Sequence, residues 1–166
     1  MSLEKLSPCK VNLLLNILSR RPDGFHELET VLYPIRLCDE LILARRGQGI
    51  QLSCNAPGLP TDARNLVYRA ALMFLEAAQI RAGVRLELRK NIPVSAGLGG
   101  GSGNAATTLL GLNELFGEPL SPERLQLIAA SLGSDVPFFL QDQPALATGR
   151  GESDALRHSK LHHPGA

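Results

Sequence analysis

The chain has 166 residues, of which 44% are hydrophobic and 20% are charged, and its formal net charge at pH 7 is +1. This balance is typical of a folded domain, and it excludes a disordered chain and a basic surface for nucleic acid or anionic membranes. No apolar run approaches the roughly 20 residues that span a bilayer, and no signal peptide is predicted. The three cysteines, Cys9, Cys38 and Cys54, are odd in number and lack metal-ligand spacing, so they predict reduced thiols in a cytoplasmic protein.

The first part of the chain predicts strands joined by turns. Residues 10–17 alternate between apolar and polar side chains, which predicts a half-buried strand. Its apolar face comprises Val11, Leu13, Leu15 and Ile17. A turn is predicted at residues 20–24 from its Pro-Asp-Gly sequence. Further strands are predicted at residues 25–35, 39–44 and 50–54, followed by a loop at residues 55–60.

The rest of the chain predicts helices around one more strand. A helix capped by Thr61 or Asp62 is expected to run to about Ile80, before a strand at residues 84–89. Two more helices are predicted at residues 101–116, closed by Gly117, and from Ser121-Pro122 to Leu132. Shorter ordered segments follow at residues 133–140 and 145–148. Strands followed by helices predict an α+β domain with two layers.

A glycine-rich loop separates the strand at residues 84–89 from the helix after it. Five glycines fall within Gly97–Gly103, in Pro93-Val-Ser-Ala-Gly-Leu-Gly-Gly-Gly-Ser-Gly-Asn-Ala-Ala106. Glycine allows close approach to the main chain, and the N–H groups at a helix N-terminus attract anions, so the loop is a candidate phosphate site. No lysine follows the last glycine, as a P-loop requires, and Ser102 occupies the third glycine position of a dinucleotide motif. The alternative is a flexible turn without a ligand.

The loop resembles the ATP loop of the GHMP kinases, which include the galactose, homoserine, mevalonate and phosphomevalonate kinases. Other segments extend the resemblance in the same order, and together they cover about Lys5 to Glu152. They are most similar to the branch of the family whose substrate is a cytidyl-methylerythritol. These segments are Ser7-Pro-Cys-Lys-Val-Asn-Leu13, Arg21-Pro-Asp-Gly-Phe-His-Glu-Leu28, Asn65-Leu66, Gly133-Ser-Asp-Val-Pro-Phe-Phe139 and Gly149-Arg-Gly-Glu152.

The resemblance implies the domain organisation. Residues 1–152 would form the N-terminal, ATP-binding domain of a GHMP kinase, a two-layer α+β domain of a type also found in a small-subunit ribosomal protein. Residues 153–166 match nothing in the family, and we expect a disordered tail. Members of the family continue with a ferredoxin-like second lobe, which we expect to be missing here. We therefore expect weak or no turnover, an exposed apolar patch where the second lobe would dock, and self-association through that patch.

The resemblance also implies an ATP site with Mg²⁺. Main-chain N–H groups of the glycine loop would hold the triphosphate, and Ser102 would add a hydroxyl to the phosphates or to the metal. Asn65 and Leu66 would lie near the adenosine. The complete set of expected ATP-binding residues is Pro93, Gly97, Leu98, Gly99, Gly100, Gly101, Ser102, Gly103, Asn104, Asn65 and Leu66.

The expected reaction transfers the γ-phosphoryl group of ATP to the 2-hydroxyl of the cytidyl-methylerythritol substrate, in the non-mevalonate isoprenoid pathway. Asp135 matches the catalytic base and Lys10 its partner, while Asn12, Phe25 and His26 match substrate-binding positions. The alternative is that Asp135 caps a helical turn and Lys10 is an exposed strand residue. At the level of the whole chain, the alternatives are a non-catalytic nucleotide-binding or interaction fragment, or another GHMP small-molecule kinase.

Overall fold

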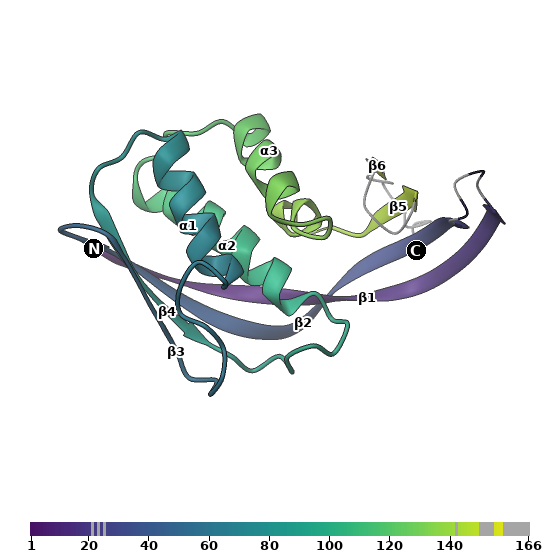
Figure 1. Cartoon of the computed structure of the whole chain (residues 1–166), viewed down its shortest axis with the longest axis horizontal. Coiled ribbons are helices and arrows are strands. Elements are labelled where there is room, and N and C mark those ends of the chain that lie inside the picture. The colour runs from purple at the N-terminus through teal and green to yellow at the C-terminus, as the bar shows by residue number, and fades with distance from the viewer. Residues whose placement is uncertain (21, 23, 25, 142, 150–154, 158–166) are drawn as a thin grey trace, which may run out of the picture.

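The computed structural model describes residues 1–20, 22, 24, 26–141, 143–149 and 155–157. Over these residues the chain folds into one sheet, and Figure 1 shows the helices stacked on one face of it. The predicted α+β class with two layers is therefore confirmed. The elements are β1 (Ser2–Arg20), β2 (His26–Arg46), β3 (Ile50–Cys54), α1 (Leu66–Ala77), β4 (Gly83–Arg89), α2 (Gly100–Leu115), α3 (Pro122–Leu132), the 3₁₀ helix η1 (Pro137–Leu140), β5 (Ala145–Gly149) and β6 (Ala155–Arg157).

Strand β2 organises the sheet because it has a partner along both edges. β1 pairs antiparallel with one edge over nearly its whole length, from Ser2 opposite Ala44 to Arg20 opposite His26. The other edge is shared by two antiparallel partners, β4 near the C-terminal end of β2 and β5 near its N-terminal end. β3 adds to β4 as the parallel pair, and β6 adds to β5.

The long strand β2 replaces two predicted strands, at residues 25–35 and 39–44. The predicted break falls where the pairing shifts register, because Cys9 lies opposite Ile35 while Pro8 lies opposite Cys38. Arg36 and Leu37 are the extra residues of a bulge, which bends a strand without ending it. Two predicted strands are thus one strand with an irregularity.

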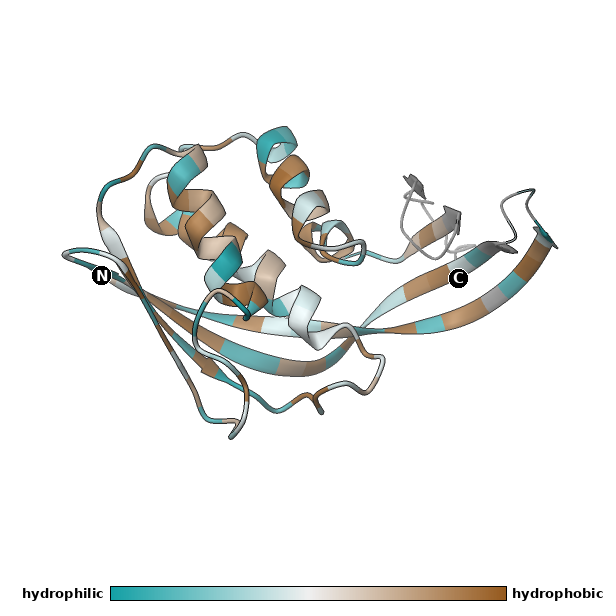
Figure 2. Cartoon of the chain, in the orientation of Figure 1, coloured by the Kyte–Doolittle hydropathy of each residue, from teal (hydrophilic) through white to brown (hydrophobic). Residues whose placement is uncertain are grey.

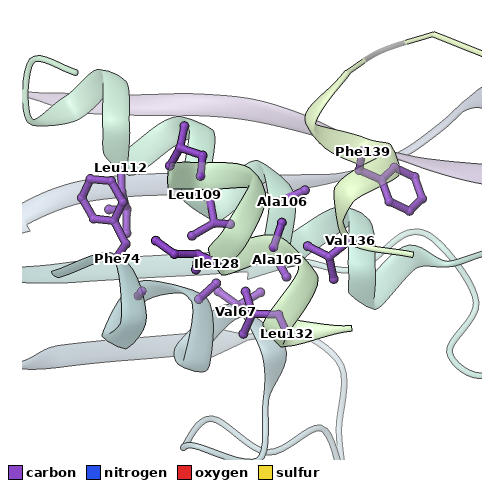
Figure 3. Close-up of a cluster of buried hydrophobic side chains, with 14 of the residues drawn as sticks. Val67, Phe74, Ala105, Ala106, Leu109, Leu112, Ile128, Leu132, Val136 and Phe139 are labelled. Carbon is purple, nitrogen blue, oxygen red and sulfur yellow. The ribbon is translucent and has the colours of Figure 1, made fainter. Parts of the chain in front are cut away.

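Helix α2 lies at the centre of the helical layer and is buried on nearly all sides. Phe74 of α1 and Ile128 of α3 pack around Leu109 and Leu112 of α2, and Figure 3 shows these side chains filling the space between the helices. A helix buried all round carries a weak amphipathic pattern, so its position follows from tertiary packing rather than from periodicity. The side chain of Ser121 accepts a hydrogen bond from the Arg124 N–H, which confirms the predicted cap of α3.

The predicted cap of α1 is wrong. The N-cap is Asn65, whose side chain accepts a hydrogen bond from the Val67 N–H at 2.9 Å, so the helix begins later than Thr61 or Asp62 would allow. Asp62 instead binds Arg64 in the preceding turn. Several residues in this segment are good N-caps by type, and only the chain path decides which one is used.

The outer part of the β1–β2 hairpin projects beyond the helices (Figure 1). Leu13 is 62% exposed and Ile17 is 66% exposed, so the predicted burial of this face is wrong for both residues. None of the described helices covers them, because α2 packs on the inner part of β1 and β2 and α1 packs on β3 (Figure 1). Figure 2 shows apolar residues along this outer part of β1.

Two further observations concern membrane-spanning helices and the expected tail. Among the described residues, no helix is both long enough and apolar enough to cross a membrane. Residues 153, 154 and 158–166 of the expected tail lie outside the described part, whereas Ala155–Arg157 pair with β5. The expectation of a disordered tail therefore stays a prediction.

Candidate functional site

A pocket of about 330 Å³ lies beside the N-terminus of α2. Its walls come from the glycine loop, the end of β4 and the turn before α1, which are far apart in the sequence. All the expected ATP-binding residues except Gly103 line it. The structure therefore brings together Pro93, Gly97, Leu98, Gly99, Gly100, Gly101, Ser102, Asn104, Asn65 and Leu66.

The glycine loop turns into α2 through a left-handed residue. Gly99 is the N-cap of the helix with φ 69° and ψ 16°, a conformation that costs a residue with a Cβ far more than it costs glycine. No side chain caps this end of the helix. The N–H groups of the N-cap and of the first three helical residues have no partner within a helix, and the helix dipole adds partial positive charge there. The pocket thus has an anion-attracting wall made of main chain.

Gly103, unlike Gly99, is explained by close packing and not by a left-handed backbone. Its N–H donates to the Gly99 carbonyl at 2.9 Å, so it belongs to the helix and is not free for a phosphate. A Cβ at this position would lie 2.4 Å from the Pro8 carbonyl oxygen. Gly103 therefore lets α2 lie directly against β1, which corrects the prediction that its N–H belongs to the phosphate cradle.

Lys10 and Asp135 form an ion pair next to the glycine loop, with the Lys10 side chain packed against Gly99, although neither residue lines the pocket. The Lys10 ammonium lies 3.8 Å from Asp135 Oδ2 and donates to Asn12 Oδ1 at 2.6 Å. At 3.8 Å the charges attract each other without a direct hydrogen bond. The Lys10 side chain is only 9% exposed, whereas Asp135 is 33% exposed. Asn12 in turn donates to Thr30 Oγ1 at 3.0 Å, so both polar ends of its amide are held by neighbours.

The geometry contradicts both structural alternatives for this pair. The N-cap of η1 is Val136 and receives no side-chain hydrogen bond, so Asp135 does not cap the turn. Lys10 is buried rather than exposed at the sheet edge. Its main-chain N–H also donates to the Leu98 carbonyl at 2.8 Å, which ties β1 to the glycine loop. Asp135 presents a partly open carboxylate next to a fixed ammonium, an arrangement that suits proton transfer.

A second lysine–aspartate pair lies under the pocket, and the sequence analysis missed it. The Lys90 ammonium binds Asp39 Oδ2, and these side chains are 8% and 0% exposed. Asn104 Nδ2 donates to the same oxygen at 2.8 Å and to Ser7 Oγ at 2.9 Å. The available signal was Lys90, a lysine three positions before Pro93 and directly after a strand of alternating pattern.

The turn before α1 forms the opposite wall. Asn65 caps the helix and donates to the Pro60 carbonyl at 2.8 Å, so the structure uses its side chain to shape the wall. Arg64 also lines the pocket, and its guanidinium holds the pKa of Asp62 at about 2 by a direct hydrogen bond. The expected contacts of Asn65 and Leu66 with an adenosine stay predictions.

The remaining expected residues are placed only in part. Phe25 lies outside the described residues, and of His26 the structure gives its position as the first residue of β2. Ser102 lines the pocket in the first turn of α2. Within the described part of the chain, no group of three or more His, Cys, Asp or Glu side chains could hold a metal. Cys9, beside Lys10, is a free thiol whose pKa is raised by burial, which keeps it protonated.

Comparisons with known proteins bear on the whole domain. The model of the family described as "GHMP kinases N terminal domain" matches residues 65–149, from the cap of α1 to the end of β5. A Synechococcus protein is 50% identical over 147 residues, which are 89% of this chain and 47% of that protein. A Geobacter metallireducens protein is 46% identical over 152 residues, or 91% of this chain and 54% of the relative. Both are named 4-diphosphocytidyl-2-C-methyl-D-erythritol kinase.

Solved structures agree with this result. A crystal structure of 4-(cytidine 5'-diphospho)-2C-methyl-D-erythritol kinase superimposes with a TM-score of 0.84 at 43% identity, covering 96% of this chain and 56% of that one. A homoserine kinase from Cytophaga hutchinsonii matches with a TM-score of 0.65 at 20% identity, covering 96% of this chain and 51% of the other, which shows the shared fold alone. This chain spans about half the length of the curated relatives that it matches.

Proposed function

This chain belongs to the GHMP kinase family, and from that premise we propose that it transfers the γ-phosphoryl group of ATP to the 2-hydroxyl of 4-diphosphocytidyl-2-C-methyl-D-erythritol. Relatives that bear this kinase's name support the choice of substrate. The reaction belongs to the non-mevalonate isoprenoid pathway, and we place the protein in the cytoplasm, where a thiol such as that of Cys9 stays reduced.

One observation carries the proposal: the glycine loop and the Lys10–Asp135 pair meet at Gly99. A Cβ at Gly99 would lie 3.2 Å from Cγ and Cε of Lys10 and 3.2 Å from Cζ of Phe139. Lys10 therefore packs against the N-cap of α2 while its ammonium pairs with Asp135, so one side chain links the helix N-terminus to the carboxylate, and a kinase needs both. A phosphate donor bound at the loop would have its reacting end close to a proton acceptor.

We assign the donor nucleotide to the pocket beside α2. The free N–H groups from Gly99 to Ser102 would bind the phosphates, since they are the unpaired donors of the helix N-terminus. The apolar surfaces of Leu59, Leu66 and Leu88 line the other side and suit an adenine ring. Lys90 and Arg64 already have carboxylate partners, which leaves the main chain as the principal unneutralised positive wall.

The chemical step is assigned to Asp135 and Lys10. The Asp135 carboxylate accepts the proton of the 2-hydroxyl as that oxygen bonds to the γ-phosphorus and the bond to the β-phosphate oxygen breaks. Lys10 holds the carboxylate in place from 3.8 Å and offers its remaining protons to the transferred group. Asn12 fixes the Lys10 ammonium through the hydrogen bond of 2.6 Å.

The residues present fit Mg²⁺ as a companion of the nucleotide. Mg²⁺ in such sites is held mainly by phosphates and water with one or two protein oxygens, and the Ser102 hydroxyl in the first turn of α2 can be one of these. When bound, the metal would neutralise charge on the phosphates. Phe25, His26 and Asn12 are assigned to the cytidyl-methylerythritol substrate, with the ring of Phe25 stacking on the base.

The experiment is a pair of measurements on the purified chain. Titration with ATP and Mg²⁺ should raise the unfolding temperature, because a ligand of the folded state stabilises it. Transfer of the γ-phosphoryl group is then assayed with the cytidyl substrate, homoserine and mevalonate, and we expect transfer to the cytidyl substrate alone. Transfer to homoserine or mevalonate would favour another GHMP kinase, and absence of nucleotide binding would refute the proposal.

A non-catalytic nucleotide-binding domain is the second candidate, and it is favoured by the fact that neither Lys10 nor Asp135 lines the pocket beside α2. We expect these 166 residues alone to turn over more slowly than a chain of the relatives' length, because closure around the substrate lowers the barrier. Nucleotide binding without any transfer would select this candidate. Transfer as fast as that of a chain of the relatives' length would contradict the expected slow turnover.

We also propose self-association through the hairpin. Leu13, Leu14, Ile17, Leu18 and Tyr33 are 44–66% exposed on its outer part and form the hairpin patch. Removing such a patch from water is favourable by about 25 cal/mol per Å² of apolar surface. Sedimentation should show association that increases with concentration and disappears in Leu13→Ser/Ile17→Ser. A monomer at all concentrations would refute it.

A further inference from the structure

We propose that Asp39 is the positioning residue of the glycine loop and fixes both of its ends through one buried carboxylate. The inference rests on the proposed nucleotide function for its consequence, but its structural part can be tested without nucleotide. Asp39 lies on β2, far from the loop in sequence, and it is fully buried.

The first end of the loop is held by main-chain bonds. Asp39 Oδ1 accepts from the Asn91 N–H at 2.7 Å and from the Ile92 N–H at 2.8 Å. These are the last two residues before Pro93, where the loop begins. Lys90, the residue before them, binds the other carboxylate oxygen through its ammonium. Three consecutive residues are therefore attached to one side chain.

The second end of the loop is held through α2. Asn104 Nδ2 donates to Asp39 Oδ2 at 2.8 Å, and its Oδ1 accepts from Lys90 Nζ at 3.2 Å. Asn104 is 2% exposed and follows directly after the last glycine of the loop. The carboxylate thus accepts hydrogen bonds from residues on both sides of residues 93–103. We call Asp39 and its four donors, Lys90, Asn91, Ile92 and Asn104, the clasp.

The network also places a charge beneath the loop. A Cβ at Gly100 would lie 3.3 Å from Lys90 Nζ, so the ammonium lies directly against the first helical residue. Asp39 and Asn104 hold it there on two sides. The buried charges are paired and hydrogen-bonded, which is the condition under which they are tolerated in an interior.

Fixing both ends should matter more for phosphate than for adenosine. The loop carries many glycines and would lose much conformational freedom on binding if its ends were loose. The residues assigned to the adenine ring, Leu59, Leu66 and Leu88, come from the turn before α1, from α1 and from β4, and the Asp39 carboxylate bonds to none of them. A variant of Asp39 should therefore weaken ADP much more than adenosine.

The test compares Asp39→Asn with Thr108→Val. Thr108 is a fully buried residue on the same helix whose hydroxyl donates to the main-chain carbonyl of Asn104. Its loss disturbs α2 at Asn104 but keeps every side-chain bond to Asp39, which makes it the matched control. In Asp39→Asn we expect ADP affinity to fall about 10- to 100-fold, the value of one or two hydrogen bonds to a charged group, with adenosine affinity nearly unchanged. Equal losses for both ligands, or unchanged ADP affinity, would overturn the proposal.

Hydrogen exchange of the loop amides gives a readout without nucleotide. Residues 93–103 should exchange faster in Asp39→Asn than in Thr108→Val, when both are compared at equal overall stability. If Asp39→Asn does not fold, Asn104→Ala releases only the second end and keeps the ion pair, and it should show the same two changes to a smaller degree. Unchanged exchange in a folded variant would refute the clasp. If the wild-type chain fails to bind ADP, the proposed function fails, and the exchange result still decides the clasp.

Discussion

Two lysine–aspartate pairs border the glycine loop, and they differ in how fully each carboxylate is surrounded. Asp39 is buried and accepts from four donors, the N–H groups of Asn91 and Ile92 and the side chains of Lys90 and Asn104. Asp135 is 33% exposed and faces the Lys10 ammonium at 3.8 Å. The first carboxylate has no capacity left for a ligand, whereas the second retains it.

This difference gives Asp39 a structural role and Asp135 a chemical role. A carboxylate with every lone pair engaged can hold a loop but cannot accept a proton from a substrate, because it would have to give up buried bonds. A partly open carboxylate beside an ammonium can do so. The same two residue types thus serve two purposes, and burial decides which one each pair serves. Four changes test this contrast, and they follow in order of their expected effect on the free energy of unfolding.

The largest effect is expected from breaking the buried pair. Lys90→Met or Asp39→Asn alone leaves one charge buried without its partner and should cost about 3–5 kcal/mol. The double variant removes both charges and should cost clearly less than the sum of the two. Urea unfolding followed by circular dichroism measures all three. Additive costs in the double variant would mean that the two charges do not interact.

A smaller loss of stability is expected at the contact between β1, which carries Lys10, and α2, which carries Asn104. Gly103→Ala places a Cβ against the Pro8 carbonyl oxygen and should cost about 1–3 kcal/mol, as overpacking does. Gly101→Ala is the matched control in the same helix turn, because its Cβ would lie 3.9 Å from Leu66 Cδ1. The control should be neutral, or more stable by up to about 1 kcal/mol. Equal results for the two variants would disprove the close packing at Gly103.

The partly exposed pair Lys10–Asp135 should contribute little to the free energy of unfolding and much to phosphoryl transfer. Asp135→Asn should change the free energy of unfolding by less than about 1 kcal/mol, as expected for a pair with solvent access. Phosphoryl transfer should fall by about 10²–10⁴, the contribution of a positioned base. Thermal unfolding and the transfer assay on the same preparation give both numbers. A large loss of stability with transfer retained would reverse the roles of the two pairs.

The smallest effect on the free energy of unfolding is expected from the exposed pair Asp62–Arg64, with which the two pairs beside the loop can be compared. Arg64 lowers the pKa of Asp62 from 3.8 to about 2. Because the folded-state pKa is lowered, the stabilisation is present above pH 3.8 and is lost as the pH falls towards 2. The difference in unfolding temperature between the wild type and Asp62→Asn should therefore be small at neutral pH and vanish on acidification. A difference that grows on acidification would contradict the sign.

Local sequence was enough to predict most elements near their observed positions. Alternation predicted β4, and the Ser121-Pro122 pair predicted the start of α3 with its cap. It was not enough for β2, where a bulge at Arg36 and Leu37 was taken for a break. Periodicity cannot distinguish these cases, since both interrupt the alternation while only pairing with a partner strand keeps the chain extended.

By itself the sequence determined the two-layer class, the glycine loop and the family, because repeated local patterns and the motifs in their order along the chain carry that information. Lys10 and Asp135 were also expected as partners, and the structure places them 3.8 Å apart. Only the tertiary structure decided that Gly103 serves packing and that Asp39 holds the loop, since both facts depend on atoms from distant strands. It also decided that the outer hairpin is exposed, because burial depends on where the helices end, which no strand pattern records.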